Sequence, residues 1–245
     1  MTYQRMDKLP VPQDDIYWLA EPQEGLLEAL YQLESDPDPV RVFDGTAFSA
    51  QASQSPILFN VSVNGGLLES LAASPQQLRG LLVMADASRA DLLGQLRSLL
   101  EVRFQQHRKA LLRYYDPRVA SYLLPRCTES MLPRWLGPVN AFVWFGGTWV
   151  DEYENHLSWQ SLSWRGDRQS SQQGQPLALS EEQLQRMVEQ GLERFAWEWL
   201  RSNPGNGMSL VMEWIRAGIA AGHDEHRSLT AWLDGRTQMS GGHYG

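Results

Sequence analysis

The sequence predicts an α+β protein, in which a mixed sheet with packed helices precedes a smaller all-helical part. Three observations favour this class. Short apolar runs alternate with amphipathic segments over residues 1–165, which is typical of strands and helices packed in layers. Residues 166–176 are rich in Gly, Ser and Gln and contain no large apolar side chain. Beyond them, apolar residues recur at helical spacing.

These observations predict two lobes. An α/β lobe is expected over residues 1–165, a linker over residues 166–176 and a helical lobe over residues 177–245.

The first lobe is expected to begin with a strand at Ile16–Ala20 and an amphipathic helix at Gln23–Glu34. Further apolar runs of strand length occur at Val40–Phe43, Ile57–Val63 and Leu81–Met84. Turn signals such as Asp-Gly and Asn-Gly-Gly follow the first two of these runs, which supports their assignment as strands.

The clearest helix of this lobe follows Ser88, a good N-cap, with Asp91 at the third helical position. A strand is then expected at Leu111–Tyr115. Another helix is expected to begin at Asp116-Pro117, because Asp caps well and Pro is favoured at the first helical position. The last strand is expected at Val139–Phe145.

The second lobe is expected to begin with a helix capped by Ser180, with Gln183 three residues later, and to continue to Ser202. Further helices are expected at Met208–Ala221 and His226–Leu233. The first of these three helices carries an apolar stripe on one face, which predicts a buried side. The stripe consists of Leu184, Val188, Leu192, Phe195 and Trp199.

Trp197 points away from that stripe. At about 100° per residue, its side chain is directed to nearly the opposite side of the helix. A large indole in that position needs a second surface, so it is expected either to pack between the two lobes or to contact a partner protein. Trp197 is therefore a candidate partner-binding aromatic residue.

Composition limits the classes of function. The chain has 245 residues and a net charge of −8, so a phosphate backbone is an improbable partner and nucleic-acid binding is not expected. One cysteine excludes an internal disulfide bond and fits a reducing compartment. The N-terminus has no apolar signal-peptide core, and no stretch is apolar enough to insert into a membrane. A cytoplasmic protein is expected.

No catalytic motif is found in the sequence. A phosphate-binding P-loop, a dinucleotide-binding glycine pattern and a nucleophile elbow are all missing. Cys127 has no neighbouring base in the sequence to activate it as a nucleophile. The segment His223-Asp224-Glu225-His226 is interpreted as a polar connector between helices and not as a metal site. We therefore expect no enzyme activity, no cofactor, no metal and no catalytic residue.

The most distinctive segment is Arg113-Tyr114-Tyr115-Asp116-Pro117-Arg118-Val119. Asp116 suits the N-terminus of a helix because its charge complements the helix dipole. Arg118 does not, since a cation in the first turn opposes that dipole, and it is expected to meet a carboxylate in this chain or in another protein.

This segment is part of a longer pattern that resembles the domain-of-unknown-function 4123 family. The similarity extends over about residues 16–140 and also includes Gly80-Leu81-Leu82, the leucine-rich stretch Leu92–Leu100 and Leu136-Gly137-Pro138. One departure is Phe104–Lys109, which has no glycine where the family usually has a turn with one.

The resemblance implies an adaptor or chaperone of a type VI secretion system, which binds a secreted effector toxin and helps to load it onto the spike protein VgrG. Such proteins are not catalysts and need no cofactor. An immunity protein that neutralises a cognate toxin is the alternative, because its composition would look the same. The motif residues expected to shape the fold or contact a partner are Arg113, Tyr115, Asp116, Pro117, Arg118, Gly137 and Pro138.

Overall fold

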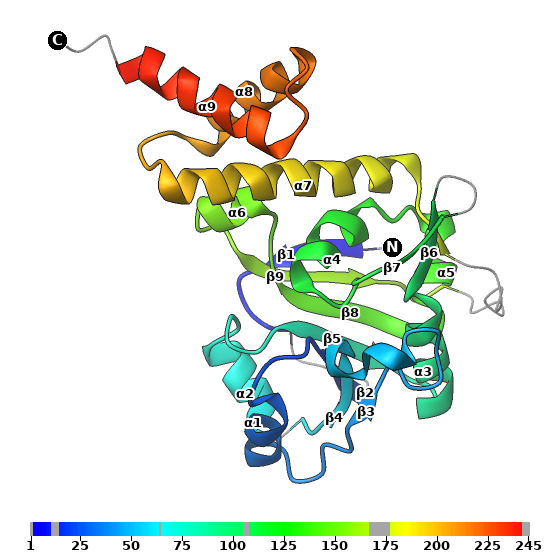
Figure 1. Ribbon diagram of the computed structural model, residues 1–245. Helices are drawn as coiled ribbons and strands as arrows, with labels where there is room; N and C mark the ends of the chain where they lie inside the picture. The colour runs from blue at the N-terminus through cyan, green and yellow to red at the C-terminus, as the bar shows by residue number, and fades with distance from the viewer. Residues whose placement is uncertain (1, 11–14, 64, 105–107, 167–176, 242–245) are drawn as a thin grey trace. The chain divides into compact units, whose positions relative to one another are not determined.

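The computed structural model describes residues 2–10, 15–63, 65–104, 108–166 and 177–241 (Figure 1). The chain forms two compact units. The larger unit comprises Met1–Gly147 and Leu157–Leu184, and the smaller unit comprises Thr148–His156 and Gln185–Gly245. Residues 167–176 of the predicted linker lie outside the described residues, so the predicted boundary stays a prediction.

The larger unit is built on a seven-stranded sheet with the order β1-β9-β8-β5-β2-β4-β3. Each neighbouring pair in this sheet is antiparallel. Its strands are β1 (Thr2–Met6), β2 (Asp15–Ala20), β3 (Val40–Arg41), β4 (Ile57–Val61), β5 (Gly80–Ala85), β8 (Val139–Gly146) and β9 (Ser158–Ser163).

A second, three-stranded sheet in this unit has the order β10-β6-β7. It pairs β6 (Glu101–Phe104) with β7 (Arg108–Leu111) in the antiparallel sense and with β10 (Leu177–Ala178) in the parallel sense. The α+β class is thus confirmed. The mixed pairing expected of the main sheet occurs only in this small sheet among the described residues.

The larger unit also contains the following helices. They are α1 (Leu26–Leu33), α2 (Gly66–Ala73), α3 (Arg89–Ser98), α4 (Pro117–Leu123) and α5 (Leu132–Trp135), with the 3-10 helices η1 (Ser49–Gln54), η2 (Leu124–Arg126) and η3 (Glu129–Met131). The predicted cap of α3 is confirmed, because the Ser88 side chain accepts a hydrogen bond from the Asp91 N–H.

The core of the larger unit follows from the two-residue period of its strands. Phe59, Trp18, Leu82 and Val143 pair side by side across β4, β2, β5 and β8. They are buried in one cluster with residues of α1 and α2. Successive side chains of a strand point to opposite faces, so the next row along these strands faces the other way.

That second row is also buried. It runs through Leu58, Leu19, Leu81, Trp144 and Gln160, and all five side chains are fully enclosed. Burial of both faces explains why these strands read as continuous apolar runs in the sequence.

Gln160 is the polar member of the buried row, and it is fully hydrogen-bonded. Its side chain accepts from the Tyr3 hydroxyl (2.8 Å) and donates to the Gly146 carbonyl (2.8 Å) and the Ser121 hydroxyl (3.2 Å). Ser121 on α4 also accepts from the Trp144 indole N–H (2.9 Å). This network fastens α4 to the main sheet.

The smaller unit is helical. It contains α6 (Trp149–Tyr153), α8 (Met208–Ala220), α9 (His226–Gly241) and α7 (Glu181–Ser202) beyond its first residues. The predicted capping box is confirmed by reciprocal hydrogen bonds between Ser180 and Gln183. The apolar stripe of α7 is only partly buried, because the Val188 side chain is 65% exposed. No helix in the described part of the chain is both long and apolar enough to span a bilayer.

Ser121→Ala should destabilise the larger unit by about 1–3 kcal/mol, because the Trp144 indole N–H then loses its buried acceptor. Denaturant unfolding measures this change. Ser163→Ala is the matched control, since its hydroxyl makes one exposed hydrogen bond of 3.3 Å, and a change within about 0.5 kcal/mol is expected. Equal effects of the two substitutions would contradict a structural role for the network.

Candidate functional site

The distinctive segment at residues 113–118 connects β7 to α4. The strand expected over Leu111–Tyr115 ends at Leu111, and Tyr114 and Tyr115 lie in a turn instead. Both tyrosine rings are buried, and the Tyr114 hydroxyl donates to the Leu96 carbonyl at 2.9 Å. The two bulky rings anchor the turn in the core.

Asp116 caps α4 as predicted. Its carboxylate accepts a hydrogen bond of 2.9 Å from the Arg118 N–H, and Pro117 occupies the first helical position. The Arg118 side chain is half-buried, and its predicted contact with a partner stays a prediction.

Asp116 is also part of a cluster of four charged side chains. Glu21 pairs with Arg113 and lies 3.3 Å from Arg79, measured from its carboxylate to the guanidinium Nε. Asp116 lies 3.4 Å from Arg79 and 3.9 Å from Arg113. The two carboxylates are largely buried, whereas the arginine side chains are 44% and 50% exposed. The carboxylates therefore hold two arginines in place at the surface.

Burial raises the pKa of Glu21, and the negative charge of Asp116 raises it further. Arg79 and Arg113 act in the opposite direction but do not outweigh the desolvation. Burial likewise raises the pKa of Tyr115 to about 12, so its hydroxyl stays protonated beside Arg113.

Glu21 and Arg79 were not among the predicted site residues. They meet because β2 and β5 pair with Ala20 opposite Gly80, and the Glu21 N–H continues the ladder by donating to the Arg79 carbonyl at 2.8 Å. The available signal was a charged residue directly after the buried strand Ile16–Ala20. It becomes informative only once the strand register is known.

A cavity of about 530 Å³ adjoins the charged cluster. A second cavity of about 300 Å³ shares Pro22, Gln23 and Ser53 with it, so the two lie next to each other beside α1 and η1, and together they are called the groove. The lining of the first cavity is Pro22, Gln23, Glu24, Ser53, Gln54, Leu111, Arg113 and Tyr115.

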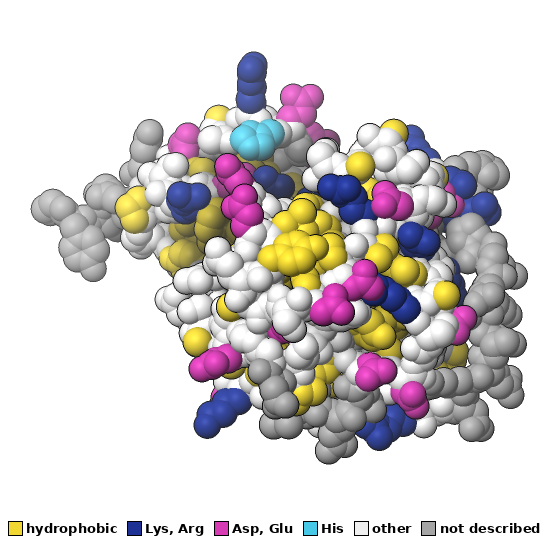
Figure 2. All heavy atoms as spheres, turned by 90° about the horizontal axis from the view of Figure 1, so that it is seen from below, with side chains coloured by type: hydrophobic (Ala, Val, Ile, Leu, Met, Phe, Trp, Pro, Cys, Tyr) yellow, Lys and Arg dark blue, Asp and Glu magenta, His cyan; other side chains and the backbone are white. Residues whose placement is uncertain are grey.

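Hydrophobic side chains are exposed near this groove. Leu27, which lines the second cavity, is 38% exposed, and Tyr31 on the same helix α1 is 59% exposed. Figure 2 shows the larger unit from the α1 side, with hydrophobic side chains gathered among acidic and basic ones. The groove thus places an oriented arginine, a residue type enriched in protein interfaces, next to apolar surface.

Gly137 and Pro138 lie elsewhere in the unit, at the end of α5. Gly137 has a left-handed backbone (φ 54°), and its N–H donates to the Pro133 carbonyl at 3.1 Å. A Cβ atom at this position would lie 2.7 Å from the Gln95 side-chain oxygen. The structure therefore explains Gly137 by helix termination and close packing.

Trp197 belongs to the smaller unit and is half-buried. Its ring centroid lies 4.8 Å from that of Trp149 on α6, and the Arg201 guanidinium lies 4.9 Å from its ring centroid. An internal surface thus already engages part of the indole, and its predicted contact with a partner stays a prediction.

Cys127, His223 and His226 are held in structural contacts. Burial raises the pKa of the Cys127 thiol to about 12, which keeps it protonated. His223 packs against Trp232 and His226 against Phe195, so the two imidazoles contact different rings. Within the described ranges, no three His, Cys, Asp or Glu side chains gather as metal ligands would.

Comparison with known proteins supports the sequence resemblance at the level of the family. The model of the family described as domain of unknown function (DUF4123) matches residues 16–134. Residues 16–134 therefore match the DUF4123 family, which confirms the resemblance predicted from the sequence. This region contains the whole charged cluster and the groove, but not Gly137, Pro138 or the smaller unit. No curated protein and no solved structure matches the chain.

Gly137→Ala should destabilise the protein by at least about 1–2 kcal/mol, because an L side chain is strained in the left-handed region and its Cβ would collide with Gln95. Gly94→Ala is the matched control. Gly94 is exposed within α3 with open space around it, so alanine should stabilise by about 0.5–1 kcal/mol. Urea unfolding of both variants measures the two changes in unfolding free energy, which should have opposite signs. A Gly137→Ala protein as stable as wild type would contradict the structural role assigned to Gly137.

Glu21→Gln tests the raised pKa of Glu21. A raised folded-state pKa contributes stability that is fully present below the unfolded pKa and is lost as the pH rises through the folded value. Glutamine does not titrate. The unfolding free energy of the variant, relative to wild type, should therefore be more favourable at about pH 7 than at about pH 3.5. Denaturant titrations at both pH values measure this, and the reverse trend would show that the arginines dominate.

Proposed function

We propose that this chain is a non-catalytic adaptor of a type VI secretion system. It binds a secreted effector protein in the cytoplasm and helps to load that effector onto the spike protein VgrG. The observation that carries the proposal is the DUF4123 match at residues 16–134, which encloses the segment Arg113–Arg118 and its charged cluster.

The groove beside Arg113 supports a binding role. Glu21 and Asp116 restrict the Arg113 side chain, while half of its surface remains open to solvent. Restraint before binding reduces the conformational entropy that association would otherwise cost. Arginine is also among the residues that dominate the energetics of protein interfaces, and Arg113 lines the cavity wall, where the buried Tyr115 ring supports it from behind.

The same residues support binding in preference to catalysis. Burial raises the pKa of both Tyr115 and Cys127 to about 12, so both stay protonated near neutral pH. Neither side chain therefore supplies a nucleophile or a base there. Glu21 is engaged by arginines. The proposed mechanism is therefore stoichiometric capture of a protein, with the groove as one contact surface.

Arg113→Gln should weaken effector binding by about 10-fold to 100-fold, which is the effect expected of an interface anchor. Calorimetry with the protein encoded next to this chain measures the affinity. Arg126→Gln is the matched control, because Arg126 has similar exposure and one carboxylate partner, Glu182, but does not line the groove. Equal affinities of the two variants, both with wild-type melting, would rule out the groove as the contact.

Deletion of the gene tests the function itself. Export of the one cognate effector should stop while the secretion system continues to export others. If export continues and cells without the protein are instead killed by the effector, the chain is an immunity protein and the adaptor proposal is wrong.

A further inference from the structure

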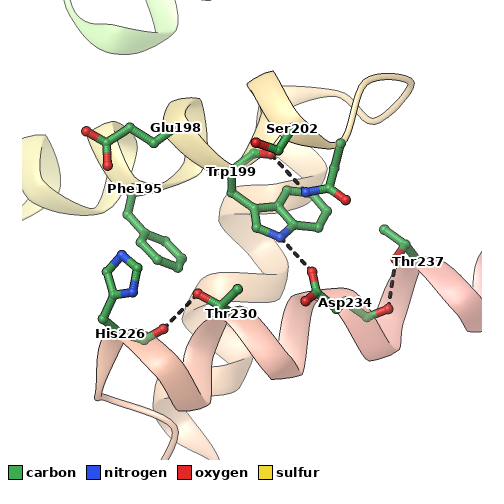
Figure 3. A pocket seen from close by; sticks show the side chains of 9 residues that line it. Phe195, Glu198, Trp199, Ser202, His226, Thr230, Asp234 and Thr237 are labelled. Carbon is green, nitrogen blue, oxygen red and sulfur yellow. Dashed lines mark hydrogen bonds between the residues drawn. The ribbon is translucent and has the colours of Figure 1, made fainter.

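A pocket of about 600 Å³ lies between α7 and α9 in the smaller unit, outside the region matched by the family (Figure 3). In Figure 3, Asp234 and His226 extend from α9 toward Trp199 and Phe195 on α7. The nine lining residues are Phe195, Glu198, Trp199, Ser202, Asn203, His226, Thr230, Asp234 and Thr237.

The walls of this pocket are fixed by specific contacts. The Trp199 indole is 6% exposed, and its N–H donates to one Asp234 carboxylate oxygen at 3.0 Å. The His226 and Phe195 rings pack edge to face, with centroids 5.0 Å apart and planes at 87°. Aromatic rings and a carboxylate are thus held next to one another before any ligand arrives.

The lining is negatively charged. It contains the carboxylates Glu198 and Asp234, and none of its nine residues is Lys or Arg. Glu198 already pairs with Arg194 at 2.8 Å on the helix surface. Asp234 forms no ion pair with any residue that the structure describes, so its charge is the one available to a ligand.

An exposed apolar strip leads along α7 to the pocket. Val188 and Leu192 share a helical face with Phe195 and Trp199, and Val188 is 65% exposed. Helix α9 contacts the later part of this face through Phe195 and Trp199. A small ligand bound in the pocket would leave this apolar strip exposed to water, whereas a protein segment is long enough to bury it.

We infer that this pocket receives the guanidinium or ammonium group of a basic side chain on a partner protein, and that apolar residues next to that side chain cover Val188 and Leu192. Aromatic faces attract cations, and a carboxylate adds a charge-assisted hydrogen bond. The inference rests on the proposed function in that the partner is a protein, but cation binding by the pocket can be measured without that partner.

The first experiment titrates the full chain with N-acetyl-arginine amide and follows the Trp199 indole N–H by NMR. Trp199→Phe assigns that signal. The signal should shift in a saturable way, and the neutral isostere N-acetyl-citrulline amide should leave it unchanged. Equal shifts with both compounds, or no shift with either, would overturn the inference.

Two variants locate the binding. Asp234→Asn keeps an acceptor for the Trp199 indole but removes the charge, so arginine amide should bind at least about fivefold more weakly. Glu213→Gln is the matched control, because Glu213 is exposed on α8 and does not line the pocket, and its affinity should equal that of wild type. Unchanged binding by Asp234→Asn would refute the site.

A helical peptide with one arginine and leucines one turn away tests the protein source. It should bind more tightly than arginine amide, and Val188→Ser should weaken the peptide but not the free probe. If Val188→Ser affects neither, the pocket binds a free cation and the inferred partner is wrong. If neither probe binds while the effector complex still forms, this inference fails and the proposed function stands.

Discussion

The register of β2 between β4 and β5 is the constraint on which the rest of the larger unit depends. Both faces of this central strand are buried, with Trp18 in one row of the core and Leu19 in the other. A slip of one residue would exchange these two faces and misplace every side chain in both rows. The same register carries the chain past Ala20 and places Glu21 opposite Arg79. The charged cluster is therefore a consequence of core packing.

The charged cluster balances opposing electrostatic effects. Burial disfavours the ionised form of Glu21, and the neighbouring Asp116 adds repulsion. The arginines compensate in part while remaining half exposed, so their own desolvation is small. This arrangement presents two restrained cations to solvent beside a groove.

The two units differ in how completely they bury apolar surface. The second row of the main sheet is fully enclosed, and its polar member Gln160 is satisfied by Tyr3, Gly146 and Ser121. On α7, by contrast, the amphipathic stripe is covered near Trp199 and open at Val188. The exposed Val188 lies on the same helical face as the Phe195 and Trp199 walls of the acidic pocket. Both candidate surfaces thus combine restrained polar groups with apolar area.

The sequence by itself determined the local elements and the family. Ser88, Asp116 and Ser180 marked the starts of helices because capping depends on residues only a few positions apart. Apolar runs located five of the seven strands of the main sheet, but not β1 and β9, whose sequences are largely polar. The sequence did not determine the turn at Tyr114-Tyr115. Its aromatic residues are typical of strands, and a strand was therefore predicted there. Nor did the sequence show the antiparallel order of the main sheet, the exposure of Val188, or the meeting of Glu21 and Arg79 with Arg113 and Asp116. Those features depend on which distant strands and helices pack together, and the tertiary structure decided them because a local pattern does not encode its packing partner.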